Sequence, residues 1–142
     1  MDTRQMITQL YRDYESGNLA NIMASLPDDF RFEWPFEPTT ARYSGIRHSK
    51  RELLTELEDM RKDFTFSAYR ATSILVDGDR AAAQLEADVT SVATGRRFTT
   101  RIAHFWSFKD GIPLHLVEYM DSAVMARHST PAESDAPSPV SA

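Results

Sequence analysis

Apolar residues recur every three or four positions near the start of the chain, which is the spacing of an amphipathic helix. Over residues 3–16 this spacing collects the apolar side chains on one side, and Gly17 follows where a left-handed residue would end the helix. Asn18 can cap a second, shorter helix, which Pro27 would stop. The chain is therefore predicted to open with two consecutive helices.

The apolar spacing then changes to two, which is the period of a strand buried on one face. Phe30, Phe32 and Trp34 alternate with charged residues, and a proline ends the alternation. A capping-box pattern begins at Ser49. After it, apolar residues again recur every three or four positions, which predicts a helix that extends to about Lys62. We therefore expect a first strand, a loop and a third helix.

The second half of the chain, residues 64–120, has the alternation and the turn signals of a strand meander. The turn signals are the stretches DGD, TGR and KDG, at 77–79, 94–96 and 109–111. Because helices come first and long antiparallel strands follow, this order predicts an α+β domain in which the helices cover one face of a curved sheet.

Composition narrows the possible functions. With a net charge of -5 and scattered basic residues, the chain lacks the clustered basic surface that nucleic-acid binding requires. It has no cysteine, which excludes disulfides and thiolate metal sites, and no segment approaches the roughly 20 apolar residues of a membrane span. The N-terminal segment lacks the apolar core of a signal peptide, so we expect a cytoplasmic protein.

We expect two regions along the chain. Residues 1–126 are predicted to form a single domain, because 142 residues are too few for two comfortable cores. Residues 127–142 are rich in Ser, Pro and Ala, bury little, and are predicted to be a disordered tail. The four histidines show no metal-ligand spacing and the glycines form no phosphate-binding run, so neither a metal nor a cofactor is expected.

The last predicted hairpin contains the two most reactive side chains, His104 and Glu118, fourteen positions apart. Whether they share a face depends on the turn, because one residue more or less moves every side chain of one strand to the other face relative to its partner. A two-residue turn of Asp110 and Gly111 directs Glu118 away from the histidine. A three-residue loop that starts at Lys109 places both groups on one face.

The apolar pattern favours the three-residue loop, in which Phe108 pairs with Ile112 and His104 lies across from Leu116. The shared face is then nearly all apolar and comprises Ile102, His104, Trp106, Phe108, Leu114, Leu116, Glu118 and Met120. A carboxylate and an imidazole in such a wall perturb each other's protonation, as in general acid–base catalysis. The alternative is a structural pair, in which the carboxylate is only the hydrogen-bond partner of a core histidine.

Four features in this order and spacing resemble the nuclear transport factor 2-like superfamily, and within it the SnoaL-like polyketide cyclases and the ketosteroid-isomerase-like proteins. They are YESGNL, DDFRFEWP, YSGI and HFWSFKDGIPLHLVEYMDSA, and the resemblance covers about residues 3–125. It implies a cone-shaped fold in which a curved antiparallel (mixed) sheet wraps around three N-terminal helices and encloses an apolar pocket. It also implies a homodimer formed through the outer face of the sheet, where Phe105, Val117 and Tyr119 are expected.

The resemblance transfers catalytic roles to only two positions. Where ketosteroid isomerase has its base and its oxyanion tyrosine, this chain has Trp34 and Leu10, so steroid isomerisation by that mechanism is not expected. The SnoaL-like pattern, a histidine at the start of the last hairpin and a carboxylate fourteen residues later, is matched by His104 and Glu118. This match implies acid–base chemistry by that pair.

A pocket of this fold is expected to bind a small, largely apolar cyclic or polyketide-like molecule between aromatic walls. The candidate ligand-binding residues, each of which could instead be core, are Leu10, Tyr14, Trp34, Phe36, Tyr43, Ile102, Trp106, Leu116 and Met120. The alternative is a non-catalytic module for ligand binding or dimerisation, in which the bulky Trp34 fills the pocket.

Overall fold

The computed structural model describes residues 1–37 and 43–129. The elements in chain order are α1 (Thr3–Ser16), α2 (Leu19–Ser25), β1 (Arg31–Trp34), β2 (Gly45–Arg47), α3 (Lys50–Met60), β3 (Phe64–Asp77), β4 (Arg80–Ser91), β5 (Arg97–Lys109), β6 (Ile112–Met120) and α4 (Ser122–Ser129). The predicted α+β class, the three N-terminal helices and the long strands are confirmed. The short strand β2, in a segment predicted to be loop, and the helix α4 were not predicted.

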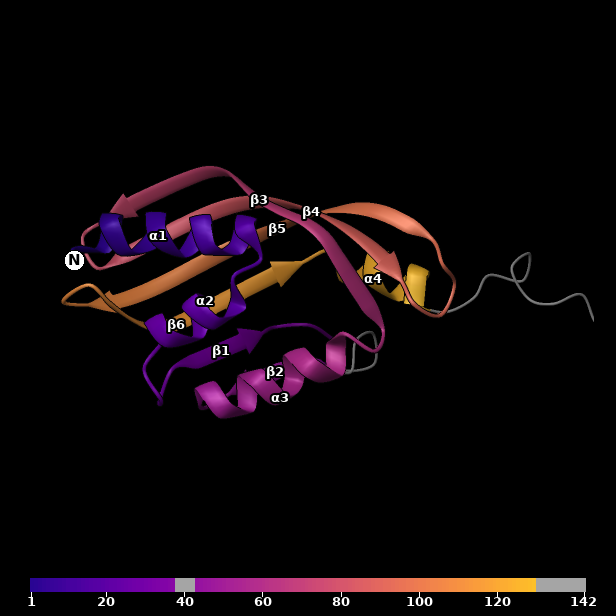
Figure 1. The fold of residues 1–142 in the computed structure, drawn as a ribbon, viewed down its shortest axis with the longest axis horizontal. Helices are drawn as coiled ribbons and strands as arrows, with labels where there is room; N and C mark the ends of the chain where they lie inside the picture. The colour runs from indigo at the N-terminus through magenta and orange to yellow at the C-terminus, as the bar shows by residue number, and fades with distance from the viewer. Residues whose placement is uncertain (38–42, 130–142) are drawn as a thin grey trace, which may run out of the picture.

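The six strands form one curved, open sheet in the order β2-β1-β6-β5-β4-β3 (Figure 1). All neighbouring strands are antiparallel except β1 and β6, which run parallel. Helix α1 packs across β3 and β4, and α3 lies beside β2 (Figure 1). The helices therefore cover one face of a mixed sheet, as expected for a cone-shaped fold.

The helix ends follow the chemistry of their capping residues. The Asp2 side chain accepts from the backbone N–H of Gln5, and Gly17 ends α1 in the left-handed conformation, with φ 71°. Ser49 accepts from the N–H of Glu52 at the start of α3. The predicted capping box is only half formed, because the Glu52 carboxylate accepts from the residue before Ser49.

The turn between β5 and β6 differs from the prediction. Asp110 and Gly111 both have positive φ, 51° and 76°, and Lys109 pairs with Ile112. Positive φ at both central residues is the signature of a two-residue type I′ turn, for which Asp-Gly is a preferred sequence. The predicted three-residue loop is therefore wrong.

A β-bulge nevertheless restores the shared face that was predicted. The register shifts between Ser107 and Phe108, so that Leu114 is an extra residue in β6. Beyond the bulge, His104 pairs directly with Glu118. The prediction that Leu114 lies on the inner face is wrong, because the bulge leaves this side chain 39% exposed.

The helix α4 changes the predicted domain boundary. Arg127 and His128, expected to begin a disordered tail, belong to α4. The His128 ring stacks on Phe98 with centroids 4.3 Å apart, and Met125 is buried against the core. These contacts hold the end of the helix against the sheet. The remainder of the predicted tail, 130–142, lies outside the described residues.

Candidate functional site

His104 and Glu118 face each other across β5 and β6 on the inner face of the sheet. His104 Nε2 lies 2.7 Å from Glu118 Oε1, and the two residues are 1% and 7% exposed. Because an ionised carboxylate only accepts hydrogen bonds, Nε2 carries the proton of this contact. The structure therefore brings the predicted pair together.

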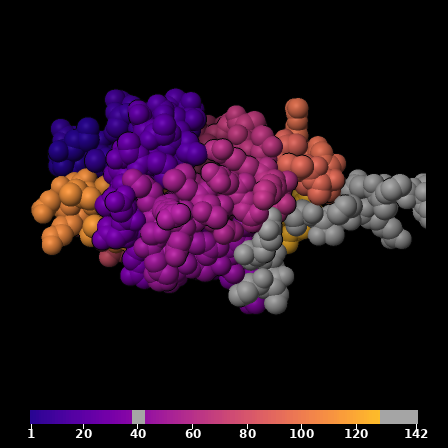
Figure 2. Space-filling model, turned by 60° about the horizontal axis from the view of Figure 1, so that its bottom comes forward, coloured from indigo at the N-terminus to yellow at the C-terminus, as the bar shows by residue number. Residues whose placement is uncertain are grey.

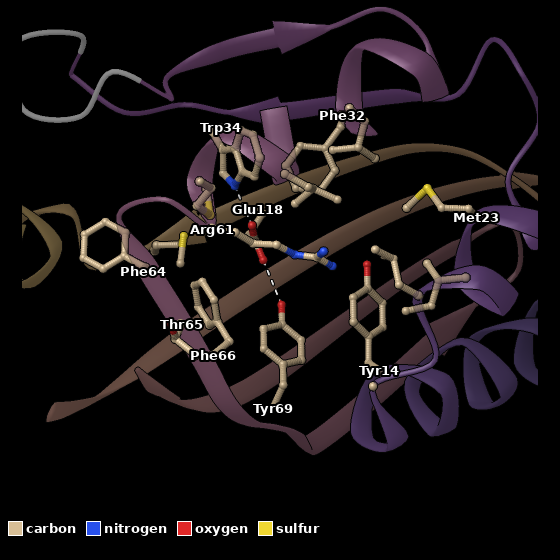
Figure 3. A pocket seen from close by; sticks show the side chains of 17 residues that line it. Tyr14, Met23, Phe32, Trp34, Arg61, Phe64, Thr65, Phe66, Tyr69 and Glu118 are labelled. Atoms are coloured by element: carbon tan, nitrogen blue, oxygen red, sulfur yellow. Dashed lines mark hydrogen bonds between the residues drawn. The ribbon is translucent and has the colours of Figure 1, made fainter. Parts of the chain in front are cut away.

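Two further donors hold the carboxylate. The hydroxyl of Tyr69, on β3, donates to Glu118 Oε1 at 2.8 Å, and the indole N–H of Trp34, on β1, donates to Oε2 at 2.5 Å (Figure 3). Burial raises the pKa of Glu118, whereas the hydrogen bonds from His104, Trp34 and Tyr69 lower it. The net effect is a pKa below the usual 4.5, so Glu118 is a carboxylate at neutral pH.

The other nitrogen of the histidine contacts helix α1. His104 Nδ1 lies 2.7 Å from the hydroxyl of Tyr11, and the indole N–H of Trp106 donates to the same hydroxyl at 2.8 Å. An indole N–H can only donate, so the Tyr11 oxygen accepts from Trp106. Among the described residues, His104 Nδ1 is the one acceptor in reach of the buried Tyr11 proton, which therefore points to it. Hydrogen bonding thus assigns a neutral imidazole with its proton on Nε2.

A single chain of hydrogen bonds results, from Trp106 through Tyr11 and His104 to Glu118. Burial raises the pKa of Tyr11 well above its usual value, so the hydroxyl keeps its proton and remains a donor. Every polar atom of this chain has a partner, which stabilises one orientation of the imidazole. Tyr11 and Tyr69 were missed by sequence reasoning, because the network joins residues that are distant in the chain.

A cavity of about 470 Å³ opens between the helices and the sheet, beside Glu118 (Figure 3). In the view of Figure 2, the magenta surface of α3 and the start of β3 lies next to the indigo surface of α1 and α2. The wall is mostly apolar and is formed by Tyr14, Gly17, Leu19, Ile22, Met23, Phe32, Trp34, Leu53, Leu57, Met60, Arg61, Phe64, Thr65, Phe66, Tyr69, Glu118 and Met120. Space for a small apolar molecule therefore adjoins the carboxylate.

The structure divides the candidate ligand-binding residues into two groups. Tyr14, Trp34 and Met120 line the cavity, whereas His104 lies behind Glu118 and does not. Six candidates lie outside the cavity wall, and they are Leu10, Phe36, Tyr43, Ile102, Trp106 and Leu116. Of these, four are fully buried in the core, Phe36 packs against its edge, and Tyr43 donates its hydroxyl to Asp63.

Three polar side chains on the cavity wall, those of Tyr14, Arg61 and Thr65, have no hydrogen-bond partner for their functional groups within 1–37 and 43–129. The ring of Tyr14 stacks on Tyr69, and its hydroxyl points into the cavity (Figure 3). Burial, and then the charge of Glu118, raise the pKa of Tyr14, so this hydroxyl is a donor. The second side chain is Arg61, whose guanidinium extends across the cavity in Figure 3.

Neither a metal site nor a membrane helix is found in the part of the chain that the structure describes. No three side chains among its His, Asp and Glu residues gather as ligands of a metal ion would. In the same residues, no helix has both the length and the apolar character needed to cross a bilayer. The chemistry of the site thus consists of a carboxylate, a histidine, tyrosines and an arginine.

Comparison with known proteins agrees with the fold. The SnoaL-like domain family matches residues 7–113, and no curated protein matches the sequence. Among solved structures, an NTF2-like protein of unknown function from Burkholderia pseudomallei has 22% identity and a TM-score of 0.79, with 92% of this chain and 99% of that chain covered. A proposed SnoaL-like polyketide cyclase from Mesorhizobium loti has 20% identity and a TM-score of 0.70, with 84% and 99% covered.

A third solved structure of the same fold was obtained with a small molecule. It is TerC co-crystallised with polyporic acid, at 16% identity and a TM-score of 0.76, with 89% of this chain and 97% of that chain covered. At these identities the similarity shows the fold alone. Since the family match spans most of the sequence, the chain belongs to the SnoaL-like domain family of the NTF2-like superfamily.

Proposed function

We propose that the cavity binds a small, largely apolar cyclic or polyketide-like molecule and that Glu118 is the general base that acts on it. The proposal rests on the observation that Glu118 lines the cavity and that its Oε2 accepts one hydrogen bond, from Trp34. A carboxylate oxygen has two lone pairs, so one remains for a proton of the ligand. TerC, a structural neighbour, was crystallised with a small molecule, which supports the binding part of the proposal.

The low pKa of Glu118 restricts the reaction class. A weak base is matched to an acidic proton, such as one on a carbon next to a carbonyl group or between two of them. Glu118 takes this proton, and the C–H electron pair moves into an enolate whose oxygen Tyr14 can hydrogen-bond. Return of the proton to another carbon restores the carboxylate and completes an isomerisation. Attack of the enolate carbon on a second carbonyl instead forms a C–C bond and an alkoxide, and transfer of the proton from Glu118 to this alkoxide completes a cyclisation.

His104 acts in this scheme as a positioning residue. Its Nε2–H holds Oε1, and the Tyr11 hydroxyl fixes the imidazole in the orientation that makes this bond. When Glu118 is protonated, the hydrogen bond to His104 keeps the carboxyl group in the same place for return of the proton. Helix α1 thus sets the orientation of the His104 ring through Tyr11, and the ring in turn holds the carboxylate of Glu118 on the sheet.

Proton abstraction can be tested with 2-tetralone, an apolar bicyclic ketone with an exchangeable C1 position. We expect the wild-type protein to accelerate hydrogen–deuterium exchange at C1, followed by NMR in D2O, and Glu118→Gln to lose the acceleration. Glu58→Gln is the matched control, because Glu58 is exposed on α3 and undergoes the same change of charge. Ligand binding is followed in the same samples by tryptophan fluorescence, since Trp34 lines the cavity.

A non-catalytic binding module is the second candidate function. It is favoured by the complete hydrogen bonding of the chain from Trp106 to His104, which a purely structural network would also have. Binding of 2-tetralone without any acceleration of exchange would support this candidate and contradict the role of Glu118 as a base.

We also propose that the chain forms a homodimer through the outer face of the sheet. Phe105 and Tyr119 lie there in edge-to-face contact, 5.8 Å apart, and are 47% and 50% exposed. Adjacent exposed aromatic residues of this kind are typical of a protein interface. Sedimentation at micromolar concentration should show a dimer that Phe105→Glu weakens, and a monomer in the wild type would contradict the proposal.

A further inference from the structure

Among the described residues of the cavity wall, two side chains are charged at neutral pH, Glu118 and Arg61, and they differ in how their charge is balanced. The carboxylate already has three donors, from Trp34, Tyr69 and His104. The guanidinium of Arg61 has no ion pair or hydrogen bond within residues 1–37 and 43–129. A ligand that enters the cavity therefore meets a satisfied anion and an unsatisfied cation.

Arg61 differs in this respect from other basic residues that belong to or adjoin α3. Lys62 forms an ion pair with Asp59, with Nζ 3.6 Å from Oδ1, and a guanidinium nitrogen of Arg47 lies 3.3 Å from Glu56 Oε2. The backbone of Arg61 is held at the end of α3 by a hydrogen bond, which its N–H donates to the carbonyl of Leu57. The end of the helix therefore fixes the backbone of Arg61 at the cavity border, while its guanidinium forms no ion pair with a described residue.

Tyr14 provides a second donor on the opposite side of the cavity from α3. Its hydroxyl points into the cavity, is protonated at neutral pH and has no acceptor among the described side chains. Water can serve both Arg61 and Tyr14 while the cavity is empty. A ligand that displaces water from the partly buried Tyr14 hydroxyl must supply an acceptor, because a donor that loses its partner there is costly, and the same ligand can pair with the guanidinium of Arg61, which is exposed at the cavity border.

On these grounds we propose that the ligand of the cavity is an organic anion, with a carboxylate or an acidic enol that pairs with Arg61 and with its apolar rings against the cavity wall. This inference rests on the proposed function of the cavity as a binding site. A planar oxyanion group can accept two parallel hydrogen bonds from a guanidinium, which a neutral carbonyl cannot. The charge of Glu118 repels the anionic end, so the reactive carbon is directed to Glu118 and the acidic group to Arg61.

The test uses two probes of nearly equal shape, 2-naphthoate and 2-naphthamide, which differ in charge at pH 7. We expect the wild-type protein to bind the anion about tenfold more tightly than the amide, as for a charge-assisted pair. Arg61→Met should reduce this ratio to about one while the affinity for the amide stays within about twofold. Arg61→Lys keeps the charge without the fork of donors and should give an intermediate ratio.

Arg51→Met is the matched control, since Arg51 is exposed on the same helix, is absent from the cavity wall and undergoes the same change of charge. It should keep the wild-type ratio, and added salt should lower this ratio in the wild type and in Arg51→Met but not in Arg61→Met. Binding is measured by tryptophan fluorescence and by the melting temperature, which also verifies that Arg61→Met is folded. If the amide binds as tightly as the anion, the anionic ligand is excluded while the binding function remains. If neither probe binds, the cavity itself is not a site for such molecules, and both proposals are wrong.

Discussion

Removal of one hydroxyl group should reveal the hydrogen-bond chain behind Glu118. Tyr11→Phe deletes the acceptor of the Trp106 N–H and the donor to His104 Nδ1, both of which are buried. A buried polar group left without a partner costs about 1–3 kcal/mol, so two such groups predict a loss of about 2–6 kcal/mol in the free energy of unfolding. For a domain of this size, the melting temperature should fall by roughly 6–18 °C.

The matched control lies one turn further along α1. Tyr14 carries the same hydroxyl, but it has no hydrogen-bond partner among the described residues, so Tyr14→Phe should change the free energy of unfolding by less than about 0.5 kcal/mol. Urea unfolding of the two variants and the wild type measures the difference directly, provided that the denaturant dependence is unchanged. Equal losses in the two variants would refute the network.

The tautomer of His104 provides a second measurement on the same variants. In the wild type, the nitrogen chemical shifts of the imidazole should report a neutral ring with its proton on Nε2, because Tyr11 donates to Nδ1 and Glu118 accepts from Nε2. In Tyr11→Phe the proton should stay on Nε2, held by Glu118, while the shift of Nδ1 moves with the loss of its donor. A wild-type ring with its proton on Nδ1 would contradict the assigned direction of the chain.

Two further predictions concern pH and the last turn. The folded-state pKa of Glu118 is below its unfolded value of about 4.5, so ionisation of Glu118 stabilises the fold fully above that pH, and this stabilisation is lost as the pH falls through the folded pKa. The difference in unfolding free energy between wild type and Glu118→Gln should therefore shrink below pH 4.5. A constant difference would show that the pKa is not lowered. Gly111→Ala should destabilise the protein by about 2 kcal/mol or more, because the new Cβ adds left-handed strain and would lie 1.9 Å from the Met1 carbonyl oxygen. Gly78→Ala, at a φ of 57° with open space around it, should cost only the strain of about 1 kcal/mol, and equal losses would exclude the clash.

The last hairpin shows how a prediction can reach the right face for the wrong reason. The apolar alternation of β5 and β6 indicated that His104 and Glu118 share a face, and this was correct. The turn that was inferred to produce it was wrong, because Asp-Gly formed its preferred two-residue turn and the extra residue appeared at Leu114 instead. Burial of the apolar face fixes the register near the core, whereas the position of the compensating bulge leaves no mark in the alternation.

The sequence by itself determined the features that depend on neighbouring residues: the helix periods, the caps at Asn18 and Gly17, the strand alternation and the family. Only the tertiary structure decided the environment of Glu118. Its donors come from β1, β3 and β5, and Trp34 and Tyr69 are separated from it by 84 and 49 positions. Insertion of β1 beside β6 and the packing of α1 over the sheet bring these groups together, and no local pattern encodes which distant side chains reach the same point.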